Sequence, residues 1–163
     1  MQRAARPARV VVTAGGTHEP IDPVRFIGNR ASGRMGFALG QRRPRSGCAG
    51  HVTAGGTAPP PAAVDLVCVE TAIEMRDAVH AAINGADLLI MNAAVADFRP
   101  AEWPSARSRR PTIKRSRCAL VRNPDISGRV GPAPRYPVKI GFAGETHDLE
   151  AYACAKLAHK GWI

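Results

Sequence analysis

Short apolar runs alternate with polar segments rich in glycine and proline along most of the chain. Several runs are apolar at consecutive positions, as in VVV from Val10 and LLIMNAAV from Leu88. Such runs are typical of strands that are buried on both faces inside a parallel sheet. The predicted strands are Val10–Thr13, His51–Ala54, Val64–Val69, Leu88–Val95, Cys118–Val121 and Val138–Ala143.

Helical patterns lie between these strands. The clearest begins at Thr71, because Thr71 and Glu74 have the spacing of a capping box and an apolar stripe at helical spacing follows. The predicted helices are about Gly33–Leu39 after the cap residue Ser32, Thr71 to about Asn84, and Leu149–Lys160 after the cap residue Asp148.

Strands that alternate with helices predict an α/β fold with a mainly parallel sheet. In such sheets, ligands bind outside the carboxyl ends of the strands. The loops predicted to form a ligand-binding site are therefore those that follow Thr13, Val95, Val121 and Ala143.

The composition favours one globular domain. The chain has 163 residues, 45% of them apolar, and no run approaches the ~20 apolar residues that a membrane span needs. Its four cysteines are widely spaced, so neither a zinc motif nor a disulfide framework is predicted. We expect a cytoplasmic protein with no membrane partner, in which residues 1–8 form a basic tail.

The formal net charge of +10 favours anionic partners: nucleotides, phosphorylated small molecules or nucleic acid. Between Arg99 and Arg122 there are eight basic residues and one acid, Glu102. This segment is either a solvated basic loop or a loop that faces phosphate groups. A nucleic-acid strip is less favoured, because basic strips of that kind interleave aromatic residues and this one has only Trp103.

The first of the four loops contains the sequence TAGGT. Gly15 and Gly16 would let main-chain N–H groups approach a phosphate or carbonyl group closely. The segment GNRASGRMG would then place Arg30 and Arg34 beside the start of a helix. Asn29, in the same segment, is interpreted on local grounds as a turn residue that tolerates left-handed geometry.

The other loops offer candidates that have structural alternatives. Asp97 would hold a ribose hydroxyl, an amino group of a base or a metal, or would cap a turn. Asn123–Asp125 is a turn signature, and Phe142 would stack on a base or pack. Lys156 and Lys160 share one helix face, where they would reach a polyphosphate or face solvent.

Taken together and in order, these motifs resemble phosphopantothenate–cysteine ligase, the synthetase half of a bifunctional coenzyme A biosynthesis flavoprotein. The resemblance runs from about Arg9 to the end, with weaker agreement over Gln41–Pro61 and Glu102–Thr112. It implies a Rossmann-like, three-layer fold with a mainly parallel sheet for residues 9–163. It rests on VVVTAGGTHEPIDPVRFIGNRASGRMGFAL, ETAIEM, NAAVADFRP, IKR, LVRNPDI, GFAGET and AKLAHKG.

The resemblance also implies a reaction and partners. The family uses CTP and Mg²⁺ to activate the carboxylate of 4′-phosphopantothenate as an acyl-cytidylate, and the amine of cysteine then displaces CMP. A homodimer is expected. FMN is expected only in the decarboxylase half that usually precedes this domain and is not part of this sequence. Because the family continues with a further strand, the domain is expected to be C-terminally truncated at Ile163.

The same resemblance assigns roles to single residues. Asn29 corresponds to the asparagine that holds the acyl-cytidylate, and Arg25 to a residue that supports this site. Asp97 matches a cytidine-binding aspartate, and Phe142 a base-contacting position. The residues that match a nucleotide-contacting turn and two triphosphate-side lysines are Pro124, Asp125, Ile126, Ser127, Lys156 and Lys160.

One motif departs from the family pattern. The family's catalytic loop has the sequence Lys-x-Lys-Lys, whereas here Thr112 stands at its first position and leaves Lys114 and Arg115. Lys114 is therefore the expected catalytic lysine, unless a neighbouring arginine substitutes. The alternative function is that of a degenerate copy that only binds nucleotide or nucleic acid. An NAD-dependent enzyme is disfavoured, because a GxGxxG motif followed by an acid about 20 residues later is absent.

Overall fold

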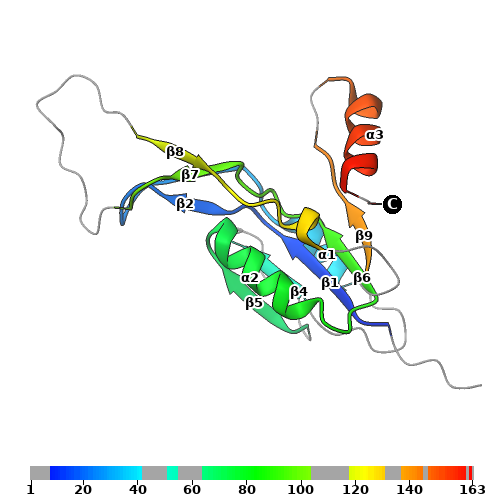
Figure 1. The fold of residues 1–163 in the computed structure, drawn as a ribbon. Helices are drawn as coiled ribbons and strands as arrows, with labels where there is room; N and C mark the ends of the chain where they lie inside the picture. The colour runs from blue at the N-terminus through cyan, green and yellow to red at the C-terminus, as the bar shows by residue number, and fades with distance from the viewer. Residues whose placement is uncertain are drawn as a thin grey trace, which may run out of the picture.

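The described part of the chain is built on a five-stranded parallel sheet (Figure 1). In this computed structural model the described residues are 8–41, 64–103, 118–130, 137–144, 147–160 and 162, together with the backbone of 51–54. The strand order is β5 (Leu66–Val69), β4 (His51–Ala54), β1 (Val10–Ala14), β6 (Leu88–Met91) and β9 (Val138–Gly141). All neighbouring pairs are parallel, which confirms the predicted fold class.

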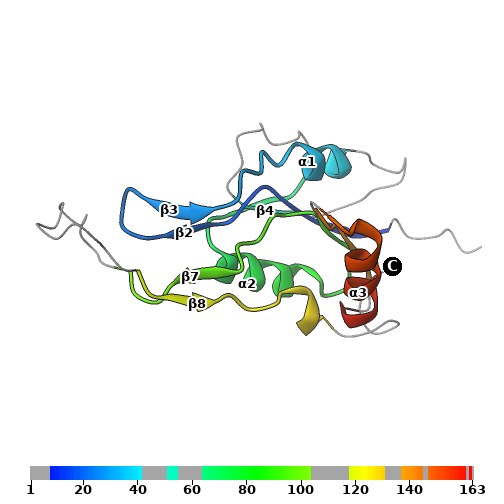
Figure 2. The same cartoon turned by 90° about the horizontal axis from the view of Figure 1, so that it is seen from above.

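Helices cover the sheet on both sides. Figure 2 shows α1 (Arg34–Gln41) and α2 (Ala72–Ala82) on opposite faces, and α3 (Leu149–Lys160) lies near the edge strand β9. This is the three-layer arrangement that the sequence predicted. Among the described residues, no helix is long and apolar enough to cross a membrane.

The capping box predicted for α2 is present. The Thr71 hydroxyl accepts a hydrogen bond from the Glu74 main-chain N–H at 3.2 Å, and the Glu74 carboxylate accepts one in return from the N–H of Thr71. This reciprocal pair satisfies donors that the first turn of a helix leaves without partners. The helix ends at Ala82, somewhat before the predicted Asn84.

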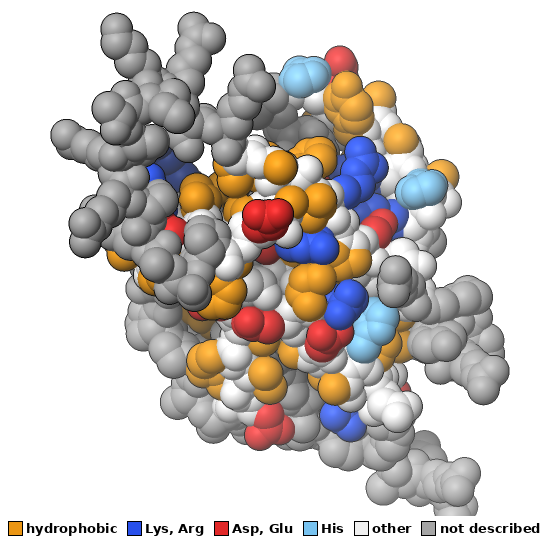
Figure 3. Space-filling view, turned by 60° about the vertical axis from the view of Figure 1, so that its left-hand side comes forward, with side chains coloured by type: hydrophobic (Ala, Val, Ile, Leu, Met, Phe, Trp, Pro, Cys, Tyr) orange, Lys and Arg blue, Asp and Glu red, His pale blue; other side chains and the backbone are white. Residues whose placement is uncertain are grey.

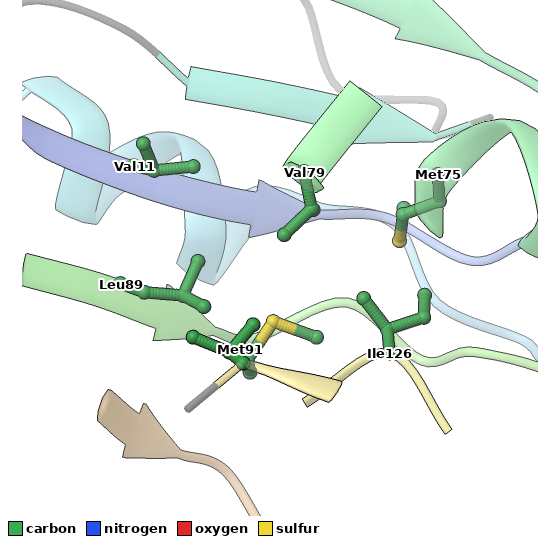
Figure 4. Packing of buried hydrophobic residues seen from close by; sticks show 7 residues of the cluster. Val11, Met75, Val79, Leu89, Met91 and Ile126 are labelled. Carbon is green, nitrogen blue, oxygen red and sulfur yellow. The ribbon is translucent and has the colours of Figure 1, made fainter. Parts of the chain in front are cut away.

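The core lies between the sheet and α2. Val11 and Leu89 are paired in register on β1 and β6, so their side chains share one face and pack toward Met75 and Val79 of α2 (Figure 4). Ile126 closes one end of this cluster. Complete burial of each such side chain stabilises the fold by about 1.5–3 kcal/mol relative to its exposure.

Two antiparallel hairpins project beyond the sheet and together form what we call the arm (Figures 1 and 2). One pairs β2 (His18–Pro20) with β3 (Phe26–Gly28), and the other pairs β7 (Phe98–Pro100) with β8 (Leu120–Arg122). The predicted strand Cys118–Val121 therefore belongs to this second hairpin and not to the parallel sheet. Three-residue strands carry too little periodicity to be recognised, so β2, β3 and β7 were not predicted.

The strand predicted over Leu88–Val95 is shorter in the structure and ends at Met91. Its apolar sequence continues, but the backbone turns because the Thr13 hydroxyl accepts hydrogen bonds from the N–H groups of Asn92 and Ala93, at 3.1 and 3.0 Å. A side chain of β1 therefore takes the place of the next strand hydrogen bonds. The short helix η1 (Ser127–Arg129) follows the predicted turn after β8.

Candidate functional site

All four loops chosen from the sequence line one cleft at an edge of the sheet. The loops after β1 and β6 are joined by main-chain hydrogen bonds: Ala94 N–H donates to Gly15 at 2.8 Å, and Thr17 N–H donates to Ala94 at 3.2 Å. The loop after β9 joins them, because Phe142 N–H donates to the Met91 carbonyl at 3.1 Å. The loops at the carboxyl ends of β1, β6 and β9 therefore lie together, as the parallel sheet predicted.

Two adjoining hollows form a cleft at this edge. One has a volume of about 620 Å³ and is lined by Gly15 and the segment 29–35; we call it the glycine half. The other, of about 500 Å³, is lined by Arg122, residues 123–127, Lys160 and Trp162; we call it the lysine half. Both halves share a wall made of Ala93, Val95, Asp97, Phe142 and Lys156. The shared wall makes the two hollows one site with two compartments.

The glycine half is shaped by close packing of α1 on β1. A Cβ atom at Gly36 would lie 2.5 Å from the Ala14 Cβ, and one at Gly33 would lie 3.2 Å from the Gly15 nitrogen. Gly15 and Gly33 also have positive φ angles, of 83° and 81°. Gly15 lines the hollow, whereas Gly16 is buried against the Asn29 carbonyl and forms a bridge with Ala94.

Asn29 lies on the wall of the glycine half. Its side-chain Nδ2 donates to the Ala94 carbonyl at 3.1 Å, so the loop after β6 fixes the amide. The local interpretation of Asn29 as a left-handed turn residue is wrong, because Asp148 is the non-glycine residue with positive φ among those described. Arg30 and Arg34 line the same hollow, as the sequence predicted.

Arg25 lies elsewhere, between β2 and β3 at the tip of the arm, and it is not part of the lining of either half. Its Nε and Nη2 atoms donate to the buried Asp22 carboxylate at 2.9 and 2.5 Å. These side-chain hydrogen bonds, with others from the N–H groups of Val24 and Arg25, lower the pKa of Asp22 from 3.8 to about 2. No local sequence pattern marks Asp22 as a partner of Arg25.

The lysine half is held together around Asp125. Its Oδ1 accepts hydrogen bonds from the Ser127 hydroxyl at 3.0 Å, the Gly128 N–H at 3.1 Å and the Lys160 ammonium at 3.3 Å. Burial alone would raise the pKa of this carboxyl. The hydrogen bonds and the Lys160 charge outweigh burial, so the pKa is lowered and Asp125 is ionised at neutral pH.

The neighbouring positions of this turn have different roles. Pro124, Asp125, Ile126 and Ser127 all line the lysine half, but the Ile126 side chain also belongs to the core. Asn123, interpreted only as a turn residue, is buried, and its Nδ2 donates to the Ala96 carbonyl at 2.8 Å. The turn is therefore tied to the loop that carries Asp97.

The shared wall presents an exposed carboxylate and an exposed ring. Asp97 accepts a main-chain hydrogen bond from Asn123 at 2.8 Å, and its side chain is exposed. Phe142 is 52% exposed. The ring is therefore not packed in the core, and its stacking on a base stays a prediction. Asp97 faces both halves and is available to a polar group of a ligand.

Lys156 and Lys160 of α3 both line the cleft, which agrees with the predicted common helix face. The Lys160 ammonium lies 5.1 Å from the centroid of the Trp162 ring, a cation–π contact. The Trp162 ring fills the space above Gly141, where an added Cβ would collide with it. Trp162 was not predicted as a site residue, because no local sequence pattern shows that the ring following α3 turns toward the cleft.

The structure does not describe the predicted catalytic lysine or most of the basic segment. Lys114 and the rest of 104–117 lie outside the described residues, as does most of the basic segment. Among the residues that are described, no group of three or more His, Cys, Asp or Glu side chains is arranged to hold a metal ion.

The sequence matches a known family over almost its whole length. The pattern of the DNA/pantothenate metabolism flavoprotein C-terminal domain covers residues 5–162. The chain is 42% identical over 165 residues to the coenzyme A biosynthesis bifunctional protein CoaBC of Mycolicibacterium smegmatis, and 37% identical over 155 residues to that of Escherichia coli. These alignments cover 94% and 93% of the chain but only 40% and 38% of the relatives.

Solved structures show the same fold. The crystal structure of a CoaBC C-terminal domain superposes with a TM-score of 0.80 at 36% identity, over 98% of this chain and 76% of that one. The DNA/pantothenate metabolism flavoprotein of Streptococcus pneumoniae has a TM-score of 0.78 at 19% identity, over 95% of this chain and 79% of that one. A Cab2 mutant in complex with phosphopantothenate-cysteine has a TM-score of 0.70 at 16% identity, over 96% and 71% of the two chains.

Proposed function

Because the chain belongs to the DNA/pantothenate metabolism flavoprotein C-terminal domain family, we propose that it is a ligase that joins 4′-phosphopantothenate to cysteine with CTP as the activating nucleotide. The single observation that best supports this function is the two-compartment cleft with its shared wall. A reaction between a nucleotide and a second anionic substrate needs two adjoining binding sites that bring the reacting phosphate and carboxylate together.

The proposed chemistry has two balanced steps. A carboxylate oxygen of phosphopantothenate attacks the α-phosphorus of CTP, and the bond to pyrophosphate breaks. The cysteine amine then attacks the acyl carbon of the resulting acyl-cytidylate, CMP leaves, and the amine loses a proton. CTP itself supplies the leaving group, so the protein needs no nucleophile. Positioning and charge neutralisation are its main contributions.

The lysine half and the shared wall suit the nucleotide. Lys156 and Lys160 supply positive charge for the triphosphate, and the turn Pro124–Ser127 lines the same hollow. The exposed ring of Phe142 is available for stacking on the base, and the Asp97 carboxylate can accept a hydrogen bond from an exocyclic amino group.

The glycine half suits the acyl group. Asn29 lines it with an amide held by the Ala94 carbonyl, while Arg30 and Arg34 bring positive charge to the same hollow. An amide fixed in this way is a preorganised donor for the oxygen on which charge develops during acyl transfer. We assign Asn29 to the acyl-cytidylate and the main chain at Gly15 to a nearby phosphate or carbonyl oxygen.

Magnesium is compatible with these residues. Mg²⁺ is commonly held by one or two carboxylates together with substrate phosphates and water, not by an all-protein cage. Asp97 is assigned to the base and Asp125 is engaged by Lys160 and its own turn, so the metal would be held mainly by the triphosphate and water. The metal would neutralise charge on the triphosphate.

The arm supports a homodimer. Its exposed apolar side chains would be covered by a second copy, and Figure 3, which brings the arm side forward, shows apolar side chains exposed among charged ones. They are Val24, Phe26, Phe98, Leu120 and Val121. Arg25, half exposed at the tip, would then support the cleft of the second copy, since it lines neither half of its own.

Mixing two inactive variants tests the shared site. Arg25→Ala and Asn29→Asp, combined one to one, should recover about a quarter of wild-type activity if each site uses Arg25 from one copy and Asn29 from the other. Half of the dimers are then mixed, and each mixed dimer has one intact site. No recovery in verified mixed dimers would contradict the assignment of Arg25 to the second copy.

The function itself is tested by supplying the chain with phosphopantothenate, cysteine, Mg²⁺ and either CTP or ATP. We expect pyrophosphate release that depends on CTP and on phosphopantothenate, with phosphopantothenoylcysteine as the product. Binding of CTP without turnover would instead support the degenerate nucleotide-binding copy. Binding of neither substrate would overturn the proposal.

A further inference from the structure

In the edge strand β9 the apolar side chains are exposed and the charged one is buried. Val138 and Ile140 are 39% and 38% exposed, whereas Lys139 between them is only 8% exposed. Lys139 is paired in register with Leu89, so its side chain enters the face of the sheet on which the core is built. A lysine is rarely buried unless its ammonium group has partners.

Among the described residues, the two hydrogen-bond partners of Lys139 are main-chain carbonyl groups. Its Nζ donates to Val130 at 2.9 Å and to Lys160 at 2.8 Å. Val130 follows η1 and so ends the turn that contains Asp125 and Ser127. Lys160 is the last residue of α3, and a positive charge at a helix C-terminus is stabilised by the carbonyl groups that have no partner there.

Among the described residues, buried side chains do not anchor helix α3, and besides the Lys139 contact the Lys160 ammonium links it to the Asp125 carboxylate at 3.3 Å. None of its twelve side chains, all of which are described, is buried, and Leu149, Tyr152 and Leu157 are exposed. A helix without a buried apolar face gains little stability from packing. Yet this helix carries Lys156 and Lys160 to the cleft.

We infer that Lys139 is a positioning residue, whose buried ammonium group ties the end of α3 to the end of the Asp125 turn and so sets the geometry of the lysine half. The Lys139 ammonium bonds the main-chain carbonyl groups of Val130, after the Asp125 turn, and of Lys160, at the end of α3. The consequence for CTP rests on the proposed function, but the tie between α3 and the turn does not.

Lys139→Met keeps the length and apolar stem of the side chain but removes all three donors. It should leave the two carbonyl groups unsatisfied and release the end of α3. Loss of a hydrogen bond to a charged group corresponds to a change of about tenfold or more in an equilibrium. Amide hydrogen exchange in α3 should therefore become about tenfold faster. Lys139→Gln, which retains donors, should show a smaller increase.

Val138→Met is the matched control, because it places the same side chain on the other face of the same strand. It should leave exchange in α3 unchanged. If Lys139→Met leaves α3 as protected as in wild type, the tie is wrong. If Lys139→Met unfolds the protein, the comparison uses Lys139→Gln against Val138→Gln, and equal exchange in those two contradicts the inference.

A double-mutant cycle separates positioning from a merely structural role. For CTP binding measured by calorimetry, Lys139→Met should weaken binding about tenfold in the wild type and by a smaller factor in Lys160→Met, because one of the side chains that Lys139 positions is then already absent. Equal effects of Lys139→Met in both backgrounds would contradict the positioning role. If the wild type bound no CTP, the proposed function would fail, while the exchange experiment would still decide the tie.

Discussion

The two halves of the cleft are constructed in different ways. The glycine half is built on closely packed main chain at the centre of the sheet, where Gly33 and Gly36 let α1 approach β1 and the loops after β1 and β6 are joined by hydrogen bonds. The lysine half is made largely of side chains on the turn 123–127 and on a helix without buried residues, together with Arg122 and Trp162. Polar contacts around Asp125 and Lys139 hold it together.

This difference in construction leads us to expect different functions for the two halves. A compartment whose walls are packed main chain keeps its shape without ligand, and such preorganisation is what stabilisation of a developing charge requires. A compartment whose walls are lysine side chains adjusts more readily to its ligand, because those side chains lose rotamer freedom only on binding. We therefore expect changes in the glycine half to affect turnover, and changes in the lysine half to affect affinity.

The largest expected effect is that of Asn29→Asp. The variant replaces a donor amide by a carboxylate in the glycine half, so kcat should fall by about 100-fold or more, as when a donor to a developing oxyanion is lost. The midpoint of thermal unfolding should change less than turnover, because Asn29 is exposed and the Ala94 carbonyl still accepts from the Thr17 N–H when the Asn29 donor is lost. Normal turnover by this variant, measured as pyrophosphate release, would remove Asn29 from the mechanism.

Gly36→Ala should have the next largest effect, and on stability. Its new Cβ would lie 2.5 Å from the Ala14 Cβ, so α1 must move off β1 at a cost of about 1–3 kcal/mol. Gly40→Ala is the control in the same helix, because nothing lies within 4 Å of its added Cβ. That variant should stabilise by about 0.4–1 kcal/mol. Urea unfolding measures both, and equal effects would show that α1 is not closely packed.

Lys156→Met and Lys160→Met should weaken CTP binding about tenfold each with a smaller change in kcat, since each removes a charge-assisted contact to phosphate. Higher salt should reduce affinity in the wild type more than in either variant. Arg76→Met is the control, because it removes the same charge from α2, away from the cleft. A fall in kcat without loss of affinity would reverse the proposed division between the halves.

The smallest effect is the pH dependence due to Asp125. The pKa of this carboxyl in the folded protein lies below its ordinary value of 3.8, so its ionised form stabilises the fold at neutral pH. The contribution, about 0.2–1 kcal/mol for a partly exposed group, is lost as the pH falls through the lowered pKa. Thermal unfolding of wild type and Asp125→Asn should therefore differ at pH 6 and converge as the pH falls through the lowered pKa of Asp125. A difference in stability between the two proteins that did not change with pH would show that ionisation of Asp125 is not its cause.

The sequence predicted the parallel sheet, its three helices and the loops that line the cleft. These features depend on local signals that tertiary contacts reinforce, such as the capping box at Thr71 and the uninterrupted apolar runs of β1 and β6. Residue roles such as that of Asn29 came from the resemblance to a family, since local chemistry favoured a turn residue there.

Other features could not be predicted because they arise between distant segments. Lys139 and Glu19 are charged residues that the sequence gives no reason to bury. Glu19 is 1% exposed because its carboxylate accepts a hydrogen bond from the N–H of Ala72, far along the chain. The early end of β6 at Met91 likewise depends on the hydroxyl of Thr13 in another strand.

The central claim, that one cleft activates an acid with a nucleotide before an amine arrives, is tested most directly by a single turnover without cysteine. Enzyme in excess over radiolabelled CTP, with Mg²⁺ and phosphopantothenate, should release pyrophosphate and retain a bound acyl-cytidylate. Later addition of cysteine should convert this species to CMP and phosphopantothenoylcysteine. Pyrophosphate release that requires cysteine from the start, or formation of CDP in place of pyrophosphate, would contradict the account.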